Sequence, residues 1–437
     1  MLRLPTLAVA ALLSLFALTS RASEGGFDGA LAEAEAKAAP LLLDFHAPWC
    51  YSCYFMKKNV LTGPEWGQVE RSNVVLSVDA DSPEGAALKE RFAVKALPSY
   101  VVLNAAGEEL GRISAERTRQ QFYPELAAIT RRNTTLDALR TQASAGGKAG
   151  LAATRTVLAA HLARNEGQPG LDWFAALPEP ARAAAAGDAT VQRTLARLSL
   201  KAAAKAKQPE ACIAAAEKAL SGKLDCESPY DLDAALECSA PAASDHRRGF
   251  LQVQAPRFET QLRTTVLAKR QGCADARSAV FALADLYEAQ GNTTARAATF
   301  NKGIRYFEPK VAKSVKADRN AADNLRVFYE ASGDTAKLDA LLEKLAAAYP
   351  DDYVYANRYA RVLAARGAHD KAIPWFAKAS EKAYGINRLK NAQARVQSLL
   401  ALQRADEARA VASEALKANG PWFPEEMTKL KSLLPAA

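Results

Sequence analysis

Two cysteines separated by two residues follow an apolar run, and this pattern constrains the fold more than any other feature of the chain. The segments are Leu41-Leu42-Leu43-Asp44-Phe45 and Ala47-Pro48-Trp49-Cys50-Tyr51-Ser52-Cys53. A Cys-x-x-Cys pair that follows a buried strand and begins a helix is typical of a dithiol redox site. The helix N-terminus favours the thiolate, which is the attacking species in thiol–disulfide exchange. Half of a zinc site is the alternative, but it requires a second pair of ligands, and the nearest other cysteine is Cys212.

The first 22 residues have the pattern of a secretory signal. Arg3 provides a positive start, residues 4–18 are mostly apolar, and small residues precede a cleavage point after Ala22. An uncleaved anchor is the alternative. No later stretch approaches the roughly 18 continuous apolar residues of a membrane-spanning helix. The mature chain is therefore expected to be soluble and exported, with the bacterial periplasm as its compartment.

The net charge of the chain argues against a nucleic-acid partner. Cleavage would remove two arginines and no acids, so the formal net charge would fall from +9 to +7. This is a small surplus of positive charge for more than 400 residues, and the sequence shows no cluster of basic and aromatic side chains. We interpret the surplus as charged side chains on a solvated surface.

Four further cysteines are expected to form structural disulfides: Cys212, Cys226, Cys238 and Cys273. An even number in an oxidising compartment favours pairing. Three pairings are possible. Cys226 with Cys238 is a plausible pair, since residues 227–230 could turn the chain between them. Four buried free thiols are the alternative.

Residues 25–131 alternate between helix and strand signals. Helices are expected at 27–38, 50–60, 84–92 and 117–131, and strands at 41–46, 74–79, 97–103 and 108–113. This order predicts a mixed sheet with helices on both faces.

These residues resemble a known family. The matching segments are residues 44–53, Val78-Asp79-Ala80-Asp81, residues 88–94 and Ala96-Leu97-Pro98-Ser99. The region looks like thioredoxin, and it is most similar to the C-terminal thioredoxin domain of the transmembrane disulfide reductases of the bacterial periplasm. The resemblance covers about a quarter of the chain. It implies a thioredoxin fold and thiol–disulfide exchange activity.

The resemblance assigns catalytic roles to four residues. Cys50 would be the exposed attacking thiolate, and Cys53 would resolve the mixed disulfide. Asp44 corresponds to a buried acid beneath the pair, whose raised pKa would let it exchange a proton with Cys53. Pro98 matches the proline that follows a cis peptide bond in the family.

The resemblance also suggests four substrate-binding residues. Trp49 would pack beside the disulfide. Tyr51 and Ser52 form the dipeptide between the cysteines, which tunes the redox potential. The backbone groups of Leu97, placed against the dithiol by the cis bond, would pair with a substrate strand.

Beyond residue 131 the strand signals stop and helical spacing continues throughout. Residues 276–420 contain an internal repeat with a period near 34, in which Gly291, Gly333 and Gly367 recur in the turns. This pattern resembles the tetratricopeptide repeat, an array whose concave face binds peptides or proteins. A structural array without a ligand is the alternative. Residues 132–275 are expected to form further, more diverged helical hairpins, bearing the possible disulfides.

The expected architecture is an α/β thioredoxin fold at residues 25–131 followed by an all-α solenoid of tetratricopeptide-like repeats. The leading functional hypothesis is an exported protein-disulfide reductase or isomerase whose repeats bind the protein partner. It would need no cofactor or metal beyond the Cys50–Cys53 disulfide. A separate membrane-bound electron donor is expected as a partner. The alternative is a repeat-based scaffold or assembly factor whose thioredoxin-like domain is mainly a binding module.

Overall fold

The computed structural model describes residues 26–242 and 244–434, which include an N-terminal α/β domain with a four-stranded mixed sheet of order β2-β1-β3-β4. β1 is parallel to β2 and antiparallel to β3, and β3 is antiparallel to β4. The strands are β1 (Leu41–His46), β2 (Val74–Asp79), β3 (Ser99–Leu103) and β4 (Glu109–Ser114). The helices of this domain are α1 (Gly26–Ala36), α2 (Tyr51–Asn59), α3 (Gly63–Ser72), α4 (Pro83–Arg91) and α5 (Arg119–Arg132).

The apolar run in β1 is buried on both faces of the sheet. Leu41, Leu43 and Phe45 join a cluster with residues of α1 and α4. Leu42 belongs to a second cluster, with Met56 of α2 and residues of α5. Successive side chains of a strand point to opposite faces, so a continuous apolar run is the sequence pattern of such a strand.

The mixed sheet and every helix and strand expected in this region are confirmed, with ends shifted by two residues or fewer. One helix, α3, was missed. Val69 is its only buried residue, so the helix lacks the apolar spacing by which the others were predicted.

The helices that follow the α/β domain continue without a strand as far as the structure describes them, in agreement with the predicted all-α region. The first group is α6 (Leu136–Ala145), α7 (Gly147–Ala163), α8 (Gly167–Ala175), α9 (Glu179–Ala186), α10 (Ala189–Lys205), α11 (Pro209–Ala219), α12 (Ser228–Ser239), α13 (Asp245–Gln261) and the π-helical turn η1 (Leu262–Val266).

The C-terminal helices form four successive hairpins and a final helix. They are α14 (Ala276–Ala289), α15 (Thr293–Val311), α16 (Arg319–Ser332), α17 (Thr335–Ala348), α18 (Val354–Ala365), α19 (His369–Ser380), α20 (Gly385–Ala401), α21 (Ala405–Asn419) and α22 (Pro424–Ser432). Gly291, Gly333 and Gly367 occupy the turns of the first three hairpins with φ of 70°, 75° and 78°, and Gln403 has φ of 61° in the fourth. Glycine suits this left-handed conformation, which explains why it marks the repeat in the sequence. The predicted helical-repeat solenoid is thus confirmed.

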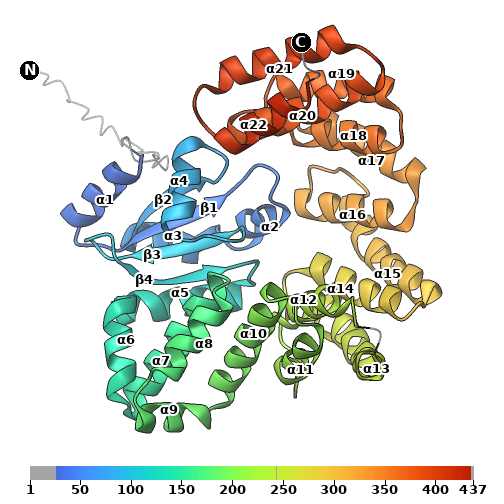
Figure 1. The fold of residues 1–437 in the computed structure, drawn as a ribbon. Helices are drawn as coiled ribbons and strands as arrows, with labels where there is room; N and C mark the ends of the chain where they lie inside the picture. The colour runs from blue at the N-terminus through green and yellow to red at the C-terminus, as the bar shows by residue number, and fades with distance from the viewer. Residues whose placement is uncertain (1–25, 243, 435–437) are drawn as a thin grey trace, which may run out of the picture.

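The helical array curves around the α/β domain, so that segments far apart in sequence lie side by side (Figure 1). α7 packs against β4 near one end of the curve, and α16 packs against α2 near its middle. The first helices of the hairpins, α14, α16, α18 and α20, supply residues that contact the α/β domain. Within the described residues, no helix has the length and apolar character needed to cross a membrane.

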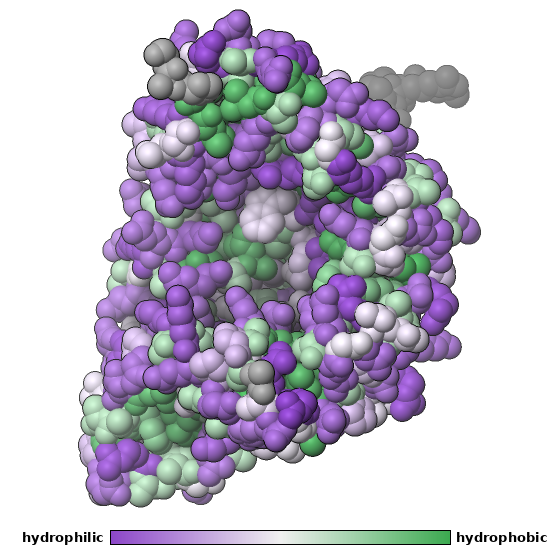
Figure 2. All heavy atoms as spheres, turned by 45° about the vertical axis from the view of Figure 1, so that its right-hand side comes forward, coloured by the Kyte–Doolittle hydropathy of each residue, from purple (hydrophilic) through white to green (hydrophobic). Residues whose placement is uncertain are grey.

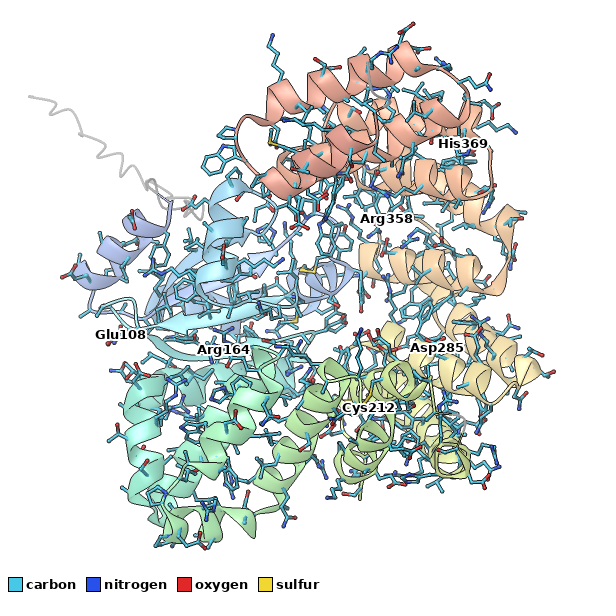
Figure 3. The ribbon with its side chains drawn as sticks, viewed as in Figure 1. Glu108, Arg164, Cys212, Asp285, Arg358 and His369 are labelled. Carbon is cyan, nitrogen blue, oxygen red and sulfur yellow. A yellow bond between two sulfur atoms is a disulfide. The ribbon has the colours of Figure 1, made fainter. Side chains whose placement is uncertain are left out.

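The four later cysteines form the disulfides Cys212–Cys238 and Cys226–Cys273. The predicted pairing of Cys226 with Cys238 is therefore wrong. Cys226 precedes α12 and Cys238 lies in its last turn. The helical residues from Ser228 to Cys238 span roughly 16 Å, far beyond the reach of one disulfide. The segment that we expected to turn the chain instead begins this helix. Cys212, on α11, is labelled in Figure 3.

The Cys226–Cys273 bond is expected to contribute more to stability than its shorter counterpart. It closes a loop of 47 residues, against 26 for Cys212–Cys238. In the chain-entropy description, replacing Cys226 and Cys273 by alanine should lower the free energy of unfolding by about 4 kcal/mol. Denaturant unfolding followed by circular dichroism measures this loss. The control is the Cys212→Ala/Cys238→Ala variant, with an expected loss of about 3.5 kcal/mol, and a loss below about 1 kcal/mol in the first variant would contradict the entropic account.

Candidate functional site

Cys50 and Cys53 form a disulfide at the N-terminus of α2, with their Cα atoms 5.2 Å apart. Cys50 caps the helix, because its Sγ accepts a hydrogen bond from the backbone N–H of Cys53 at 3.1 Å. A cap of this kind brings the first sulfur to the positive end of the helix dipole. When the pair is reduced, the same N–H would stabilise a thiolate on Cys50.

Cys50 is buried, and this corrects the expectation that its sulfur is exposed. The residue is 3% exposed, whereas the neighbouring Trp49 retains 41%. The helical array packs over the loop that leads into α2, and the sequence of the α/β domain contains no sign of this cover.

Tyr51 makes several contacts with the helical array. Its hydroxyl donates a hydrogen bond to the Asp275 carboxylate at 3.1 Å, and the guanidinium carbon of Arg277 lies 3.5 Å from the centroid of its ring. Its carbonyl oxygen accepts a hydrogen bond from the side-chain amide of Asn320 at 2.9 Å. The residue assigned to substrate binding is therefore held by the first helices of two hairpins.

Trp49 is held from both sides. Its carbonyl oxygen accepts a hydrogen bond from Arg358 at 2.8 Å, and its indole N–H donates to Asp81 at 2.6 Å. The same Asp81 oxygen accepts a hydrogen bond from Asn387 of α20 at 2.8 Å. Arg358 lies where the helical array meets the α/β domain (Figure 3).

Asp323 links the arginines that reach the dithiol loop. Its carboxylate is fully buried and forms ion pairs with Arg277 of α14, Arg326 of α16 and Arg358 of α18. Burial lowers the pKa of Arg358 to about 10, which shows how strongly the guanidinium is desolvated. One carboxylate thus compensates several buried cations, and two of these contact the residues on either side of Cys50.

Asp44 lies in β1, opposite Ser77 of β2 and Tyr100 of β3. The surrounding protein removes water from its carboxyl group and raises its pKa from 3.8 to about 6, against the opposing effects of His46 and Lys57. A carboxyl group with this pKa can hold or release a proton near neutral pH. This chemistry is what the assigned role toward Cys53 requires.

The Asp44→Asn substitution is expected to raise stability at neutral pH. Between about pH 4 and pH 6, folded Asp44 still holds a proton that the unfolded chain has released. The free energy of unfolding therefore falls by up to about 3 kcal/mol as the pH rises through this range, and it stays lower above it. An asparagine side chain cannot ionise, so the variant should lose this decline and gain most of the roughly 3 kcal/mol at pH 7. Urea unfolding of the oxidised protein at pH 4 and pH 7 provides the measurement, with Asp28→Asn on α1 as control, and equal pH dependence in all three proteins would refute the expectation.

The structure brings the remaining predicted residues to the same end of the sheet. Pro98 is buried, follows a cis peptide bond with Leu97, and directly precedes β3. Leu97 is half-buried and packs against the apolar cluster that contains Phe45. Ser52 is buried within the first turn of α2.

Sequence reasoning missed Glu116, a buried acid just beyond β4. Burial and the negative charge of Asp275 raise its pKa well above the usual value, while Ser52 and Arg277 act in the opposite direction. Its Oε2 atom has no hydrogen-bond partner among the described residues. An isolated glutamate after a strand gives no sequence signal, because its importance depends on helices more than 150 residues away.

The fold and the dithiol define a thioredoxin-like domain followed by a tetratricopeptide-like helical region. A family model described as thioredoxin-like matches residues 22–105. Residues of the chain are 36% identical over 95 positions to the thiol:disulfide interchange protein DsbD of Klebsiella pneumoniae subsp. pneumoniae, covering 21% of this chain. They are 33% identical over 95 positions to the protein of that name from Pseudomonas fluorescens. In each case the match spans 16% of the relative, so the likeness concerns one domain.

Two solved structures are also similar to parts of the chain. A thioredoxin from Thermus thermophilus has 35% sequence identity and a TM-score of 0.23, with 24% of this chain and 83% of that chain covered. A tetratricopeptide repeat protein from Parabacteroides merdae has 13% identity and a TM-score of 0.35, with 68% of this chain and 90% of that chain covered.

Proposed function

We propose that the protein is an exported thiol–disulfide oxidoreductase that reduces or isomerises disulfides of protein partners. The observation that carries this proposal is the Cys50–Cys53 disulfide at the start of α2, directly after a buried strand. The match of the same residues to thiol:disulfide interchange proteins supports it.

The proposed reaction moves two electrons from the dithiol to a substrate disulfide. The Cys50 thiolate attacks one substrate sulfur, which forms a mixed disulfide and releases the other sulfur as a thiolate. The Cys53 thiolate then attacks Cys50, restores the internal disulfide and releases the second substrate thiol. Asp44 accepts the proton that Cys53 loses. Each turnover reduces one substrate disulfide and leaves Cys50 and Cys53 joined by a disulfide.

Export to the periplasm is part of the proposal. It is supported by the signal-like pattern of residues 1–22, which lie outside the described part of the structure. Three disulfides in one chain also favour an oxidising compartment. A reductase there needs a source of electrons, and we propose a membrane-bound dithiol donor that reduces Cys50–Cys53 after each turnover. The helical repeats would hold the protein substrate close to the dithiol.

The reduction potential of Cys50–Cys53 tests the reducing role. Purified protein is equilibrated with glutathione buffers and its free thiols are counted, with the Cys50→Ser/Cys53→Ser variant as the background. A potential of about −270 mV would support a reductase. A potential near −120 mV would identify an oxidant and overturn the reducing role.

A scaffold function is the second candidate, and the burial of Cys50 under the helical array favours it. In this case the thioredoxin-like domain would act mainly as a binding module that holds the array in shape. The scaffold predicts that the Cys50→Ser/Cys53→Ser variant retains every protein partner of the wild type in co-purification from cells. Loss of those partners in the variant, with disulfide-linked complexes in the wild type, would exclude it.

A further inference from the structure

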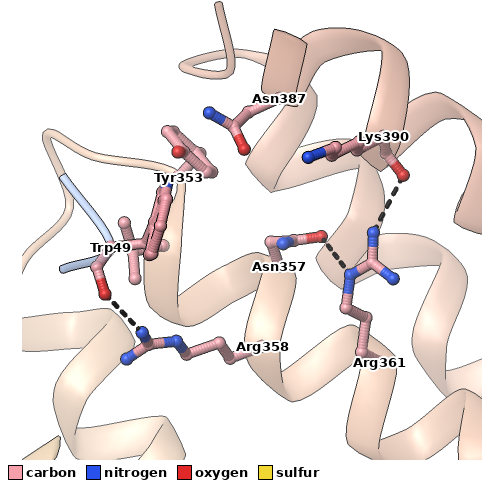
Figure 4. Close-up of a pocket in the computed structure, with 8 residues that line it drawn as sticks. Trp49, Tyr353, Asn357, Arg358, Arg361, Asn387 and Lys390 are labelled. Carbon is pink, nitrogen blue, oxygen red and sulfur yellow. Dashed lines mark hydrogen bonds between the residues drawn. The ribbon is translucent and has the colours of Figure 1, made fainter. Parts of the chain in front are cut away.

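A cavity of about 330 Å³ lies beside the dithiol loop, between the α/β domain and the helical array. Its lining residues are Trp49, Tyr353, Val354, Asn357, Arg358, Arg361, Asn387 and Lys390 (Figure 4). The space-filling view shows a hollow in the molecular surface with hydrophilic residues around its rim (Figure 2). The cavity adjoins the reactive pair through Trp49, the residue directly before Cys50.

Three cationic residues line the cavity: Arg358, which pairs with Asp323, and Arg361 and Lys390. Arg361 bonds to the side-chain oxygen of Asn357 at 3.3 Å and to the carbonyl oxygen of Lys390 at 2.9 Å, neither of which carries a charge. Among the described residues, neither Arg361 nor Lys390 forms an ion pair with a carboxylate. Arg361 and Lys390 are both exposed at the cavity, where they can meet an anion that enters from solvent.

A second observation also indicates a ligand. Tyr353 is a residue of the cavity wall, and its buried hydroxyl has no hydrogen-bond partner among the described residues. A buried polar atom without a partner is costly, and a ligand that accepts its hydrogen bond would remove that cost. Asp81, which contacts two residues of the cavity wall, is already engaged by the indole of Trp49 and the amide of Asn387.

We propose that this cavity binds a carboxylate of the thiol or disulfide substrate, close in sequence to the substrate cysteine. A carboxylate can accept hydrogen bonds from the cations Arg361 and Lys390 and from the hydroxyl of Tyr353. Because Trp49 precedes Cys50, a substrate anchored here would have its sulfur next to the dithiol loop. The inference rests on the proposed oxidoreductase function and specifies its substrate as acidic around the reactive cysteine.

Matched peptides test the charge preference. Three peptides of one length carry an intramolecular disulfide flanked by aspartate, serine or lysine, and their reduction by the reduced protein is followed chromatographically. The aspartate peptide should react about tenfold faster than the lysine peptide. The Arg361→Glu/Lys390→Glu variant should reverse this order, whereas Lys371→Glu, an exposed charge change on α19, should keep it. Glutathione disulfide, as a fourth substrate, reveals whether a small thiol can supply the carboxylate.

The outcomes separate this inference from the proposed function. Reduction of all substrates at one rate would overturn the inference and leave the oxidoreductase function standing. Reduction of none of them would count against the oxidoreductase function. In that event, calorimetry of the oxidised protein with a cysteine-free aspartate peptide still tests the cavity. Binding that weakens about tenfold in the Arg361→Glu/Lys390→Glu variant supports the site, and equal binding by both proteins overturns it.

Discussion

Replacement of Cys50 with serine is expected to abolish disulfide reduction, with a loss in rate of about 1,000-fold or more. A serine hydroxyl at the N-terminus of α2 remains protonated and cannot attack a disulfide. The helix dipole and the Cys53 N–H, which bonds to Cys50 Sγ at 3.1 Å, favour a thiolate but cannot ionise an alcohol. Reduction of insulin disulfides by the variant and the wild type, each supplied with dithiothreitol, measures the loss.

The Cys53→Ser variant should behave differently, because it keeps the attacking sulfur and lacks the resolving one. It should accumulate mixed disulfides with its substrates, visible as adducts on non-reducing gels. The Cys212→Ala/Cys238→Ala variant is the matched control, since it loses two cysteines far from the dithiol and should keep its activity at 25 °C. If Cys50→Ser formed the adducts and Cys53→Ser did not, the assigned order of the two sulfurs would be reversed.

The second large effect is expected from Asp323→Asn, which should expose Cys50. Loss of this carboxylate leaves Arg277 and Arg358 without their shared buried partner. Breaking such a network costs about 3–5 kcal/mol. If this loss destabilises the contact between the array and the dithiol loop by only about 1.4 kcal/mol, the fraction of molecules in which that contact is open rises tenfold. The alkylation rate of reduced Cys50 by iodoacetamide should therefore increase at least about tenfold.

Two further measurements keep this result interpretable. Glu330→Gln changes a carboxylate on the same helix that pairs with Arg326 at the surface, and it should leave the alkylation rate within about twofold of the wild type. Hydrogen exchange in α2 reports opening independently of thiol acidity and should accelerate in Asp323→Asn. Unchanged exchange in a variant with wild-type circular dichroism would show that Asp323 does not hold the cover closed.

Much of the α/β domain could be predicted from local sequence, because its signals come from residues close together in the chain. The run from Leu41 to Phe45 predicts a buried strand, and the cysteines that follow mark the start of a helix. α3 was missed because it buries one apolar residue and so carries no periodic signal. The repeat glycines predicted the hairpin turns because each occupies a backbone conformation that other residues adopt with strain.

Pairings across the chain could not be predicted in the same way. Cys226 and Cys238 are close in sequence but lie at opposite ends of α12, so each bonds to a cysteine from another segment. The contact of Arg358 with the Trp49 carbonyl joins residues more than 300 positions apart. Nothing in the composition of either segment specifies this contact.

The sequence by itself determined the dithiol, the strand and helix that present it, and the helical repeat, because each depends on the intrinsic preferences of neighbouring residues. The tertiary structure alone decided that Cys50 is covered and that a cationic cavity adjoins Trp49. It also decided that Asp323 binds the two arginines that contact the residues before and after Cys50. These features arise where the curved array meets the α/β domain. Their energies depend on burial and on distances between side chains, which exist only once the distant segments have packed together.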